Sequence, residues 1–266
     1  MTNTVLNVDR TDNTLTLKHC DHPKCVSDFL KQLKNTLRRG YQEIIIKSNA
    51  EAVFPNACVP IAGIIDYYTQ AGISFEFDID SASYLSKCGF ISPYARTREE
   101  IQKEQFPFDK IFCYEDSGQV ANITQAYIDA ISHQSLCETG VLNGLTWCIN
   151  EVMDNVLVHS QSSRGMVMAQ YHPAKKHIVF CIYDSGVGIY NTMKSSTHQP
   201  TSEIDALSLA IQEGIGDGKG QGNGLYGLFQ IVRENKGSLT ITSGASSLML
   251  PQSCLLYTSP SPRDLS

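Results

Sequence analysis

The stretch Asn150-Glu-Val-Met-Asp-Asn-Val-Leu-Val-His159 ends a helical pattern that begins at Glu138. An α-helix turns by about 100° per residue, so apolar residues at helical spacing gather on one side. Here that side consists of Leu145, Ile149, Val152, Met153, Val156 and Leu157. Glu151, Asp154 and Asn155 fall together on the other side. This second side is either the solvated face of an amphipathic helix or a surface that presents carboxylates and an amide to a ligand.

A second segment, Asp184-Ser-Gly-Val-Gly-Ile189, follows directly on the apolar strand pattern Ile178–Tyr183. A carboxylate at the end of a buried strand is well placed to accept a hydrogen bond from an amine of a ligand. Gly186 and Gly188 allow the backbone to turn tightly and to approach a flat ring. The alternative is an ordinary turn at the end of a strand, for which Asp-Ser-Gly sequences are common.

A third segment, Gly218-Lys-Gly-Gln-Gly-Asn-Gly-Leu-Tyr-Gly-Leu228, leads from alternating glycines into a helical pattern. Glycines leave backbone N–H groups free to face an anion, and the N-terminus of the following helix adds the positive end of its dipole. The segment lacks the Gly-x-x-x-x-Gly-Lys-Ser/Thr pattern of a P-loop. It also lacks the preceding strand that a dinucleotide-binding fold requires. It therefore indicates a phosphate site of another kind.

In this order, the three segments resemble the N, G1 and G2 boxes of the GHKL superfamily, which comprises gyrase, heat-shock chaperone, histidine kinase and mismatch-repair ATPases. The resemblance implies an ATP-binding domain at residues 109–253, with ATP and Mg²⁺ as ligands. It also implies an α/β sandwich in which helices cover one face of a mixed sheet. The periodicity agrees, because long helical patterns precede strand patterns: helices Gln119–Ser132 and Glu138–His159, then strands Met166–Tyr171 and His177–Tyr183.

The resemblance assigns roles to single residues. Asn155 is expected to ligate Mg²⁺ between the phosphates, and Glu151 to orient or deprotonate water in a branch that hydrolyses ATP. Asp184 is expected to accept a hydrogen bond from the exocyclic amine of adenine. Lys219 either adds a positive charge near the phosphates or faces solvent. Glycines are expected around the ligand: Gly186 and Gly188 beside the base, and Gly222, Gly224 and Gly227 near the phosphates.

About the first hundred residues alternate strand and helix patterns: strands Asn13–Lys18, Glu43–Lys47 and Ile73–Ile79, and helices Val26–Leu37, Cys58–Tyr68 and Ser81–Cys88. This order implies α/β layers and resembles the STAS fold of anti-sigma-antagonist proteins. Phosphorylatable STAS domains carry Ser or Thr at the start of the helix after the central strand. No hydroxyl stands clearly at that cap here, so Ser48 is only a weak candidate for a phosphoacceptor.

We therefore expect a STAS-like α/β domain at residues 1–95 and a charged linker at 96–108, followed by the ATP-binding domain. The segment Cys254-Leu-Leu-Tyr-Thr-Ser-Pro-Ser-Pro-Arg-Asp264 resembles the translated sequence of a transposase adapter used for library preparation. Residues 254–266 are then expected to be a non-native tail, and the ATP-binding domain to be C-terminally truncated, without its last sheet strand. The alternative is a natural disordered Ser/Pro tail.

The chain has 266 residues, 42% of them apolar, and a formal net charge of −6. A folded core is therefore expected, whereas an extended basic surface for nucleic acid is not. No apolar run approaches the roughly 20 residues of a membrane helix. Cysteines lie within apolar stretches, as in a reducing compartment, so we expect a cytoplasmic protein. From its charge and the length of its apolar runs, we expect it to bind neither nucleic acid nor a membrane. Potential metal ligands within His19–Cys25 have loose spacing, and we interpret this segment as a loop.

Two classes of function stay open. One is an enzyme, an ATPase or protein kinase of the histidine kinase-like ATPase superfamily, which serves as a signalling switch with a regulatory protein as partner. A conventional histidine kinase is not expected, because nothing before residue 110 resembles a helical hairpin with a phosphoacceptor histidine. The other class is a nucleotide-gated interaction module with little or no turnover.

Overall fold

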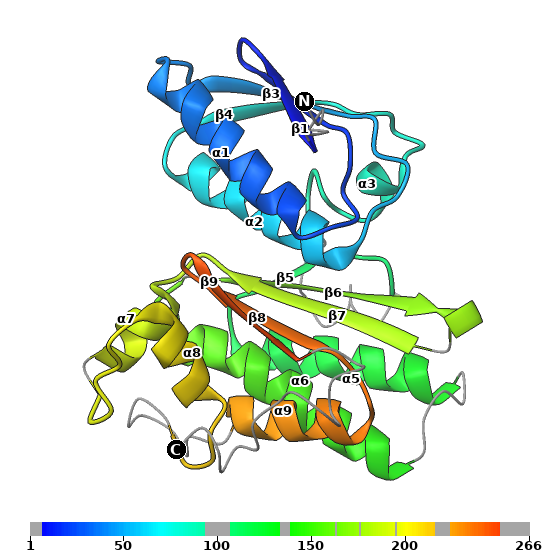
Figure 1. Ribbon diagram of the computed structural model, residues 1–266. Coiled ribbons are helices and arrows are strands. Elements are labelled where there is room, and N and C mark those ends of the chain that lie inside the picture. Colours follow the sequence, from blue (N-terminus) through cyan, green and yellow to red (C-terminus); the bar gives the residue numbers. More distant parts are fainter. Residues whose placement is uncertain are drawn as a thin grey trace, which may run out of the picture. The chain divides into compact units, whose positions relative to one another are not determined.

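The computed structural model describes residues 7–93, 107–133, 139–162, 164–175, 177–194, 196–215 and 224–250. It shows a mixed α/β protein with several helices and three small sheets, one of them a mixed sheet of four strands (Figure 1). The chain forms two compact units that interleave along the sequence. The first contains Met1–Glu115 and Arg164–Ser185, and the second contains Asp116–Ser163 and Gly186–Ser266.

The four-stranded sheet of the first unit consists of β1 (Val8–Thr11), β2 (Thr14–Leu17), β3 (Glu43–Ser48) and β4 (Ser74–Asp78), in that order. β1 and β2 form an antiparallel hairpin, whereas β2, β3 and β4 are parallel because a helix connects each to the next. Along β2 and β3, buried residues alternate with more exposed ones, so one face of the sheet is apolar. The buried residues are Leu15, Leu17, Ile44 and Ile46.

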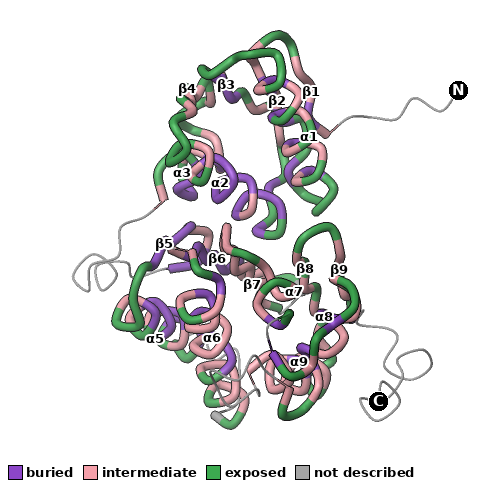
Figure 2. Tube along the Cα trace, turned by 90° about the vertical axis from the view of Figure 1, so that its left-hand side faces the viewer, coloured by how far each residue is buried: buried purple, intermediate pink, exposed green. Residues whose placement is uncertain are grey.

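Helices α1 (Lys24–Arg38) and α2 (Pro55–Gln70) pack on each other and on this sheet, and the short α3 (Tyr84–Lys87) follows β4 (Figure 1). α2 is apolar on nearly all sides, and most of its residues up to Ile65 are buried (Figure 2). A helix that is apolar all round has to be covered on more than one side. The four-stranded sheet and α1 therefore cannot bury all the apolar sides of α2.

A second, antiparallel sheet packs on another side of α2 through its strands β6 and β7. It consists of β5 (Phe112–Tyr114), β6 (Gly165–His172) and β7 (His177–Asp184). A 3-10 turn at Pro173–Lys175 joins β6 to β7. Sγ of Cys58 on α2 lies 3.6 Å from Sδ of Met168 on β6, inside one continuous apolar core. Residues of β5–β7 thus complete the core of the first unit.

The second unit contains α5 (Ser117–His133), α6 (Thr139–His159), α7 (Gly188–Lys194), α8 (Glu203–Ala210) and α9 (Gly224–Glu234), and a hairpin of β8 (Leu239–Ser243) and β9 (Ser246–Leu250). α6 packs on α5 and on α9, while α8 packs on α7 and on the hairpin. A small apolar core around Ile211, Phe229 and Leu250 joins the end of α8, α9 and the hairpin.

The helices and strands predicted from periodicity are confirmed, with ends that shift by a few residues, but the predicted sheet is not. The described strands between residues 109 and 253 form two antiparallel sheets instead of one mixed sheet, because tight turns join β6 to β7 and β8 to β9. The mixed sheet belongs to the N-terminal region. The strand expected to be missing is present as β9. β1, α7 and β9 were not predicted.

The predicted domain boundaries stay predictions. Residues 96–106 of the predicted linker lie outside the described residues, as does the predicted tail at 254–266. Within the described part of the chain, no helix has both the length and the apolar composition needed to cross a membrane.

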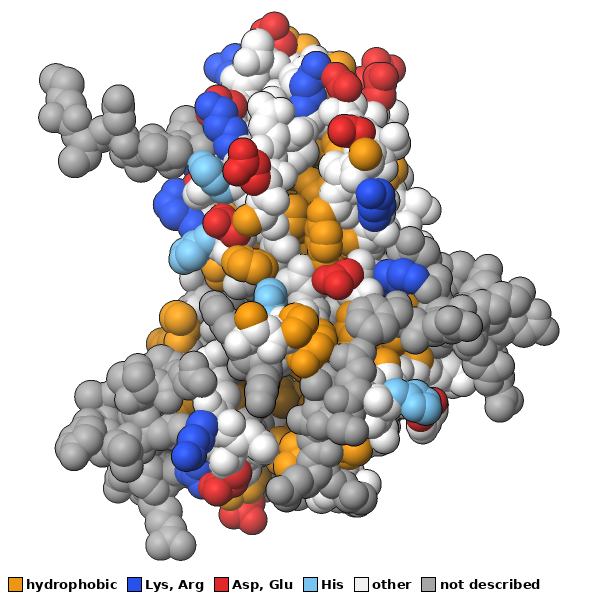
Figure 3. All heavy atoms as spheres, turned by 90° about the vertical axis from the view of Figure 1, so that its right-hand side faces the viewer, with side chains coloured by type: hydrophobic (Ala, Val, Ile, Leu, Met, Phe, Trp, Pro, Cys, Tyr) orange, Lys and Arg blue, Asp and Glu red, His pale blue; other side chains and the backbone are white. Residues whose placement is uncertain are grey.

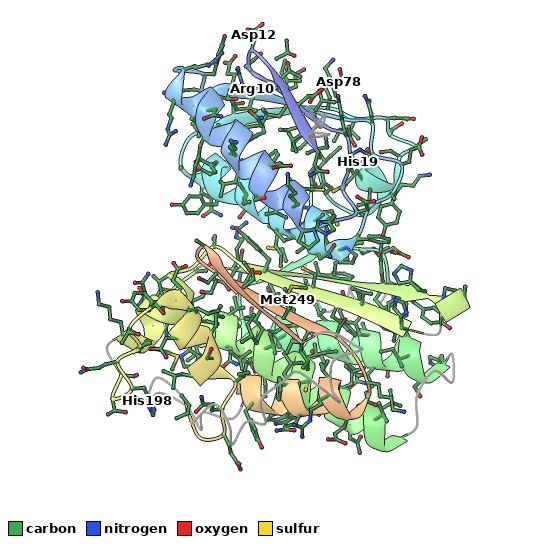
Figure 4. The ribbon with its side chains drawn as sticks, in the orientation of Figure 1. Arg10, Asp12, His19, Asp78, His198 and Met249 are labelled. Carbon is green, nitrogen blue, oxygen red and sulfur yellow. The ribbon has the colours of Figure 1, made fainter. Side chains whose placement is uncertain are left out.

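Charges of both signs are mixed on the first unit, on the face that Figure 3 shows. Ion pairs of the sheet strands include Lys18 with Asp9, and Lys47 with Asp78 at 2.6 Å. At the β1–β2 turn, Nη1 of Arg10 donates to the carbonyl oxygen of Asp12 at 3.0 Å, and both residues are labelled in Figure 4. Such exposed pairs contribute little to stability.

We expect Gly63→Ala to lower the free energy of unfolding by about 1–2 kcal/mol in urea denaturation. An added Cβ would lie 2.1 Å from Cε1 of Tyr183, so the ring on β7 would have to move. This overpacking outweighs the roughly 1 kcal/mol that alanine gains over glycine in a helix. Gly140→Ala in α6 is the matched control, because nothing lies within 4 Å of its added Cβ and it should stabilise. Equal stabilisation by both changes would contradict the packing of α2 on β7.

Candidate functional site

The polar side of α6 meets the N-terminus of α9. Glu151 and Asn155 lie one turn apart on α6, and both are half-buried. A Cβ built on Gly224, the first residue of α9, would lie 2.8 Å from Nδ2 of Asn155 and 3.1 Å from Oε2 of Glu151. The structure therefore brings three of the predicted site residues together, and glycine at position 224 is what allows their approach.

A second glycine of α9 continues this contact. A Cβ on Gly227 would lie 2.1 Å from Cζ3 of Trp147, which precedes Glu151 by one turn of α6. The ring of Trp147 thus occupies the space that a side chain at position 227 would need. Gly227, predicted near the phosphates, lies at the packing contact of the two helices. Trp147 itself keeps 40% of its surface exposed.

The turn that follows β7 is fixed at the end of α6. A Cβ on Gly186 would lie 2.1 Å from the carbonyl oxygen of Ser160, and that oxygen accepts a hydrogen bond from the amide of Val187 at 2.8 Å. Gly188 has a φ of +79°, a conformation that favours glycine. Glycine is therefore required at position 186 by the close approach of the Ser160 carbonyl oxygen, and at position 188 by its positive φ.

The same turn is also held from the β8–β9 hairpin. The amide of Ile189 donates to Oγ of Ser243 at 2.8 Å. From the last turn of α7, the hydroxyl of Thr192 lies within hydrogen-bond distance of the carbonyl oxygens of Gly188, at 3.0 Å, and of His159, at 3.3 Å. Ser160 and Ser243 were not identified from the sequence. Neither stands in a recognisable motif, and their roles depend on which segments the fold brings together.

Asp184 belongs to the other compact unit. It is the last residue of β7, is half-buried, and pairs in register with Gly165 of β6. Its charge contributes, after burial, to a raised pKa of the neighbouring Tyr183 hydroxyl. The chain enters the second unit two residues later, at Gly186.

Two other predicted site residues, Lys219 and Gly222, lie outside the described residues.

The surroundings of Glu151 and Asn155 contain further polar groups on α6. Oγ of Ser117 donates to Oδ1 of Asp154 at 3.0 Å, so the carboxylate of Asp154 is engaged with the start of α5. Burial, and secondly the charge of Glu151, raises the pKa of the Cys148 thiol to about 12. This thiol is therefore protonated at neutral pH.

Oxygen atoms of a carboxylate and an amide are ligands that Mg²⁺ accepts, and Mg²⁺ commonly takes few protein ligands beside phosphates and water. Glu151 and Asn155 fit that chemistry. Within the described segments, no group of three or more His, Cys, Asp or Glu side chains is arranged to hold a metal ion by itself. In the segment His19–Cys25, which leads into α1, both cysteines are buried, and burial is the first cause of the raised pKa of Cys20.

No protein-family model, no curated protein and no solved structure matches this chain.

We expect Gly186→Ala to lower the melting temperature by about 5 °C or more. The added methyl group would collide with a backbone oxygen, the carbonyl of Ser160, which a side-chain rotation cannot move away. Val187→Ala is the control: its side chain is 37% exposed and its backbone hydrogen bond is kept, so the melting temperature should change little. Calorimetry of both variants tests this. Equal melting temperatures would show that the turn does not approach α6 as described.

Proposed function

We propose that this chain binds ATP with Mg²⁺ in the manner of a GHKL-type ATPase or kinase and acts as a cytoplasmic regulatory switch. The observation that carries the proposal is the position of Gly224. In the second unit, the first residue of a helix that follows a glycine-rich segment lies against a carboxylate and an amide on α6. This is the juxtaposition that the resemblance of the N and G2 boxes implies.

The chemistry of this juxtaposition suits a polyphosphate. The first N–H groups of a helix have no partner within the helix, and the dipole adds positive charge at that end. Anions bind at such helix ends. Asn155 beside Gly224 would supply one oxygen to a Mg²⁺ ion held between phosphates. Glu151, whose carboxylate also lies beside Gly224, is the candidate for orienting or deprotonating water.

Residues at the end of β7 would recognise the base. We assign Asp184 to the exocyclic amine of adenine, with Gly186 and Gly188 beside the ring. The close approach of Gly186 to Ser160 and the positive φ of Gly188 support this, because they give the turn a single defined backbone path.

We further propose that residues 1–95 form a STAS-like region and that the switch acts on a regulatory protein. Support comes from the parallel pairing of β2, β3 and β4, with α1 and α2 as the connecting helices on one side of the sheet. Together these features favour a signalling protein in which nucleotide binding, and turnover where it occurs, changes the contact with a partner protein.

Asn155→Ala should weaken the binding of ATP-Mg by about ten-fold or more, because the metal and the phosphates lose an amide ligand. Trp147 is the single tryptophan of the chain and lies one turn from Glu151, so its fluorescence provides the titration signal. Asn143→Ala is the matched control, since Asn143 is an exposed asparagine of the same helix. The affinity for adenosine, which needs no metal, should be equal in all three proteins. Equal ATP-Mg affinity of Asn155→Ala and wild type would remove Asn155 from the site.

Glu151→Ala separates turnover from binding. We expect ATP-Mg binding within about three-fold of wild type, and phosphate release, or phosphoryl transfer to a protein, reduced by about 10²-fold or more. The measurement is release of inorganic phosphate at saturating ATP-Mg, with EDTA as the metal-free control. Unchanged turnover in Glu151→Ala would contradict its assignment. A wild-type protein that binds ATP-Mg without turnover would instead be a nucleotide-gated interaction module.

A further inference from the structure

The turn Gly186–Ile189 is held at both of its ends within the second unit. At one end the amide of Val187 donates to the carbonyl oxygen of Ser160, at 2.8 Å. At the other end the amide of Ile189 donates to the hydroxyl oxygen of Ser243, also at 2.8 Å. A Cβ on Gly188 would lie 2.9 Å from the same hydroxyl oxygen. The side chain of Ser243 therefore lies directly against the turn.

The hydroxyl of Ser243 acts on the first turn of α7 from another segment of the chain. The first N–H groups of a helix lack partners within the helix, and a Ser oxygen that precedes the helix commonly accepts from one of them. Here the accepting oxygen comes from the end of β8. A hydroxyl in this role stabilises the first turn of the helix, and so contributes to holding the backbone of the turn before it.

The position of Ser243 is itself fixed by α8. Ser243 pairs with Ser246 across the β8–β9 turn, where Gly244 has a φ of +63°. The carboxylate of Glu203, in the first turn of α8, accepts from the amide of Ala245 at 2.8 Å and from Oγ of Ser246 at 3.2 Å. The hairpin turn is thus bound to α8 on one side and to the start of α7 on the other.

From these contacts we infer that Ser243 is a positioning residue for recognition of the nucleobase. The inference rests on the proposed function, in which the turn Gly186–Ile189 lies beside the base. Ser243 does not touch the ligand in this role. It holds the backbone of the turn in the conformation that accepts a flat ring, and Glu203 holds Ser243 in place.

The phosphate part of the proposed site is supported by different contacts. Glu151 and Asn155 project from α6, and Gly224 begins α9 against them. None of these contacts includes Ser243. Loss of the Ser243 hydroxyl should therefore weaken every ligand that contains the base to the same extent, whatever the number of its phosphates.

The experiment compares adenosine, ADP-Mg and ATP-Mg by titration of Trp147 fluorescence in the full chain. For Ser243→Ala we expect all three dissociation constants to rise by a common factor of about five, the size of one net hydrogen bond. Ser243→Thr keeps the hydroxyl and should restore affinity to within about two-fold. Ser247→Ala is the matched control, because its hydroxyl contacts Thr242 on the same hairpin and not the turn. It should bind all three ligands as wild type does.

Other outcomes overturn the inference in distinguishable ways. A wild-type protein that binds none of the three ligands would refute the proposed function and the inference with it. Wild-type binding combined with unchanged affinities of Ser243→Ala would refute the inference alone. A loss confined to ATP-Mg would place Ser243 with the phosphates instead of the base. If Ser243 only stabilised the fold, Ser243→Ala would lower the fraction of protein that binds ligand. The dissociation constants of the folded fraction would then equal those of wild type, and the inference would be wrong.

Discussion

The contact between α6 and α9 holds the candidate site together, and glycine makes this contact possible. Gly224 lies on the side chains of Glu151 and Asn155, and Gly227 lies under the ring of Trp147. A side chain at either position would require its neighbours to move, which are the side chains of Asn155 and Glu151 at position 224 and the ring of Trp147 at position 227. The arrangement of Glu151 and Asn155 at the N-terminus of α9, on which the proposed phosphate site depends, would then change.

In the first unit, a glycine likewise allows close packing against the strand that carries Asp184. Gly63 of α2 leaves room for the ring of Tyr183, the residue before Asp184 on β7. α2 contacts both β7 and β6, and it contributes to the apolar core on the side of the four-stranded sheet as well. Since α2 is covered on two sides, the position of Asp184 depends on a helix that the sequence places in the STAS-like region. Residues before and after the predicted linker thus share the apolar core of the first unit.

Periodicity was enough to predict most individual elements, including the long helix α6 and the strands β6 and β7. It could not predict how the strands pair, because pairing depends on contacts between distant segments. β9 was missed for another reason: its sequence, Ser-Ser-Leu-Met-Leu, ends in three consecutive apolar residues and does not alternate along the strand. The site was predicted as three motifs, and the structure places Gly224 of the third beside Glu151 and Asn155 of the first. The supporting residues could not be foreseen, since the carbonyl of Ser160 and the hydroxyl of Ser243 act through the fold.

Within the second unit, α6 connects the two parts of the proposed site. Its polar side presents Glu151 and Asn155 to Gly224, and the carbonyl of Ser160 just beyond its end holds the turn that begins at Gly186. A partner that shifts α6 would therefore change the phosphate contacts and the base contacts together. A partner that acts on the β8–β9 hairpin would reach the turn without passing through α6. Regulation through the two surfaces would differ in a measurable way, because the first would change the affinity for ATP-Mg more than that for adenosine, whereas the second would change both by the same factor.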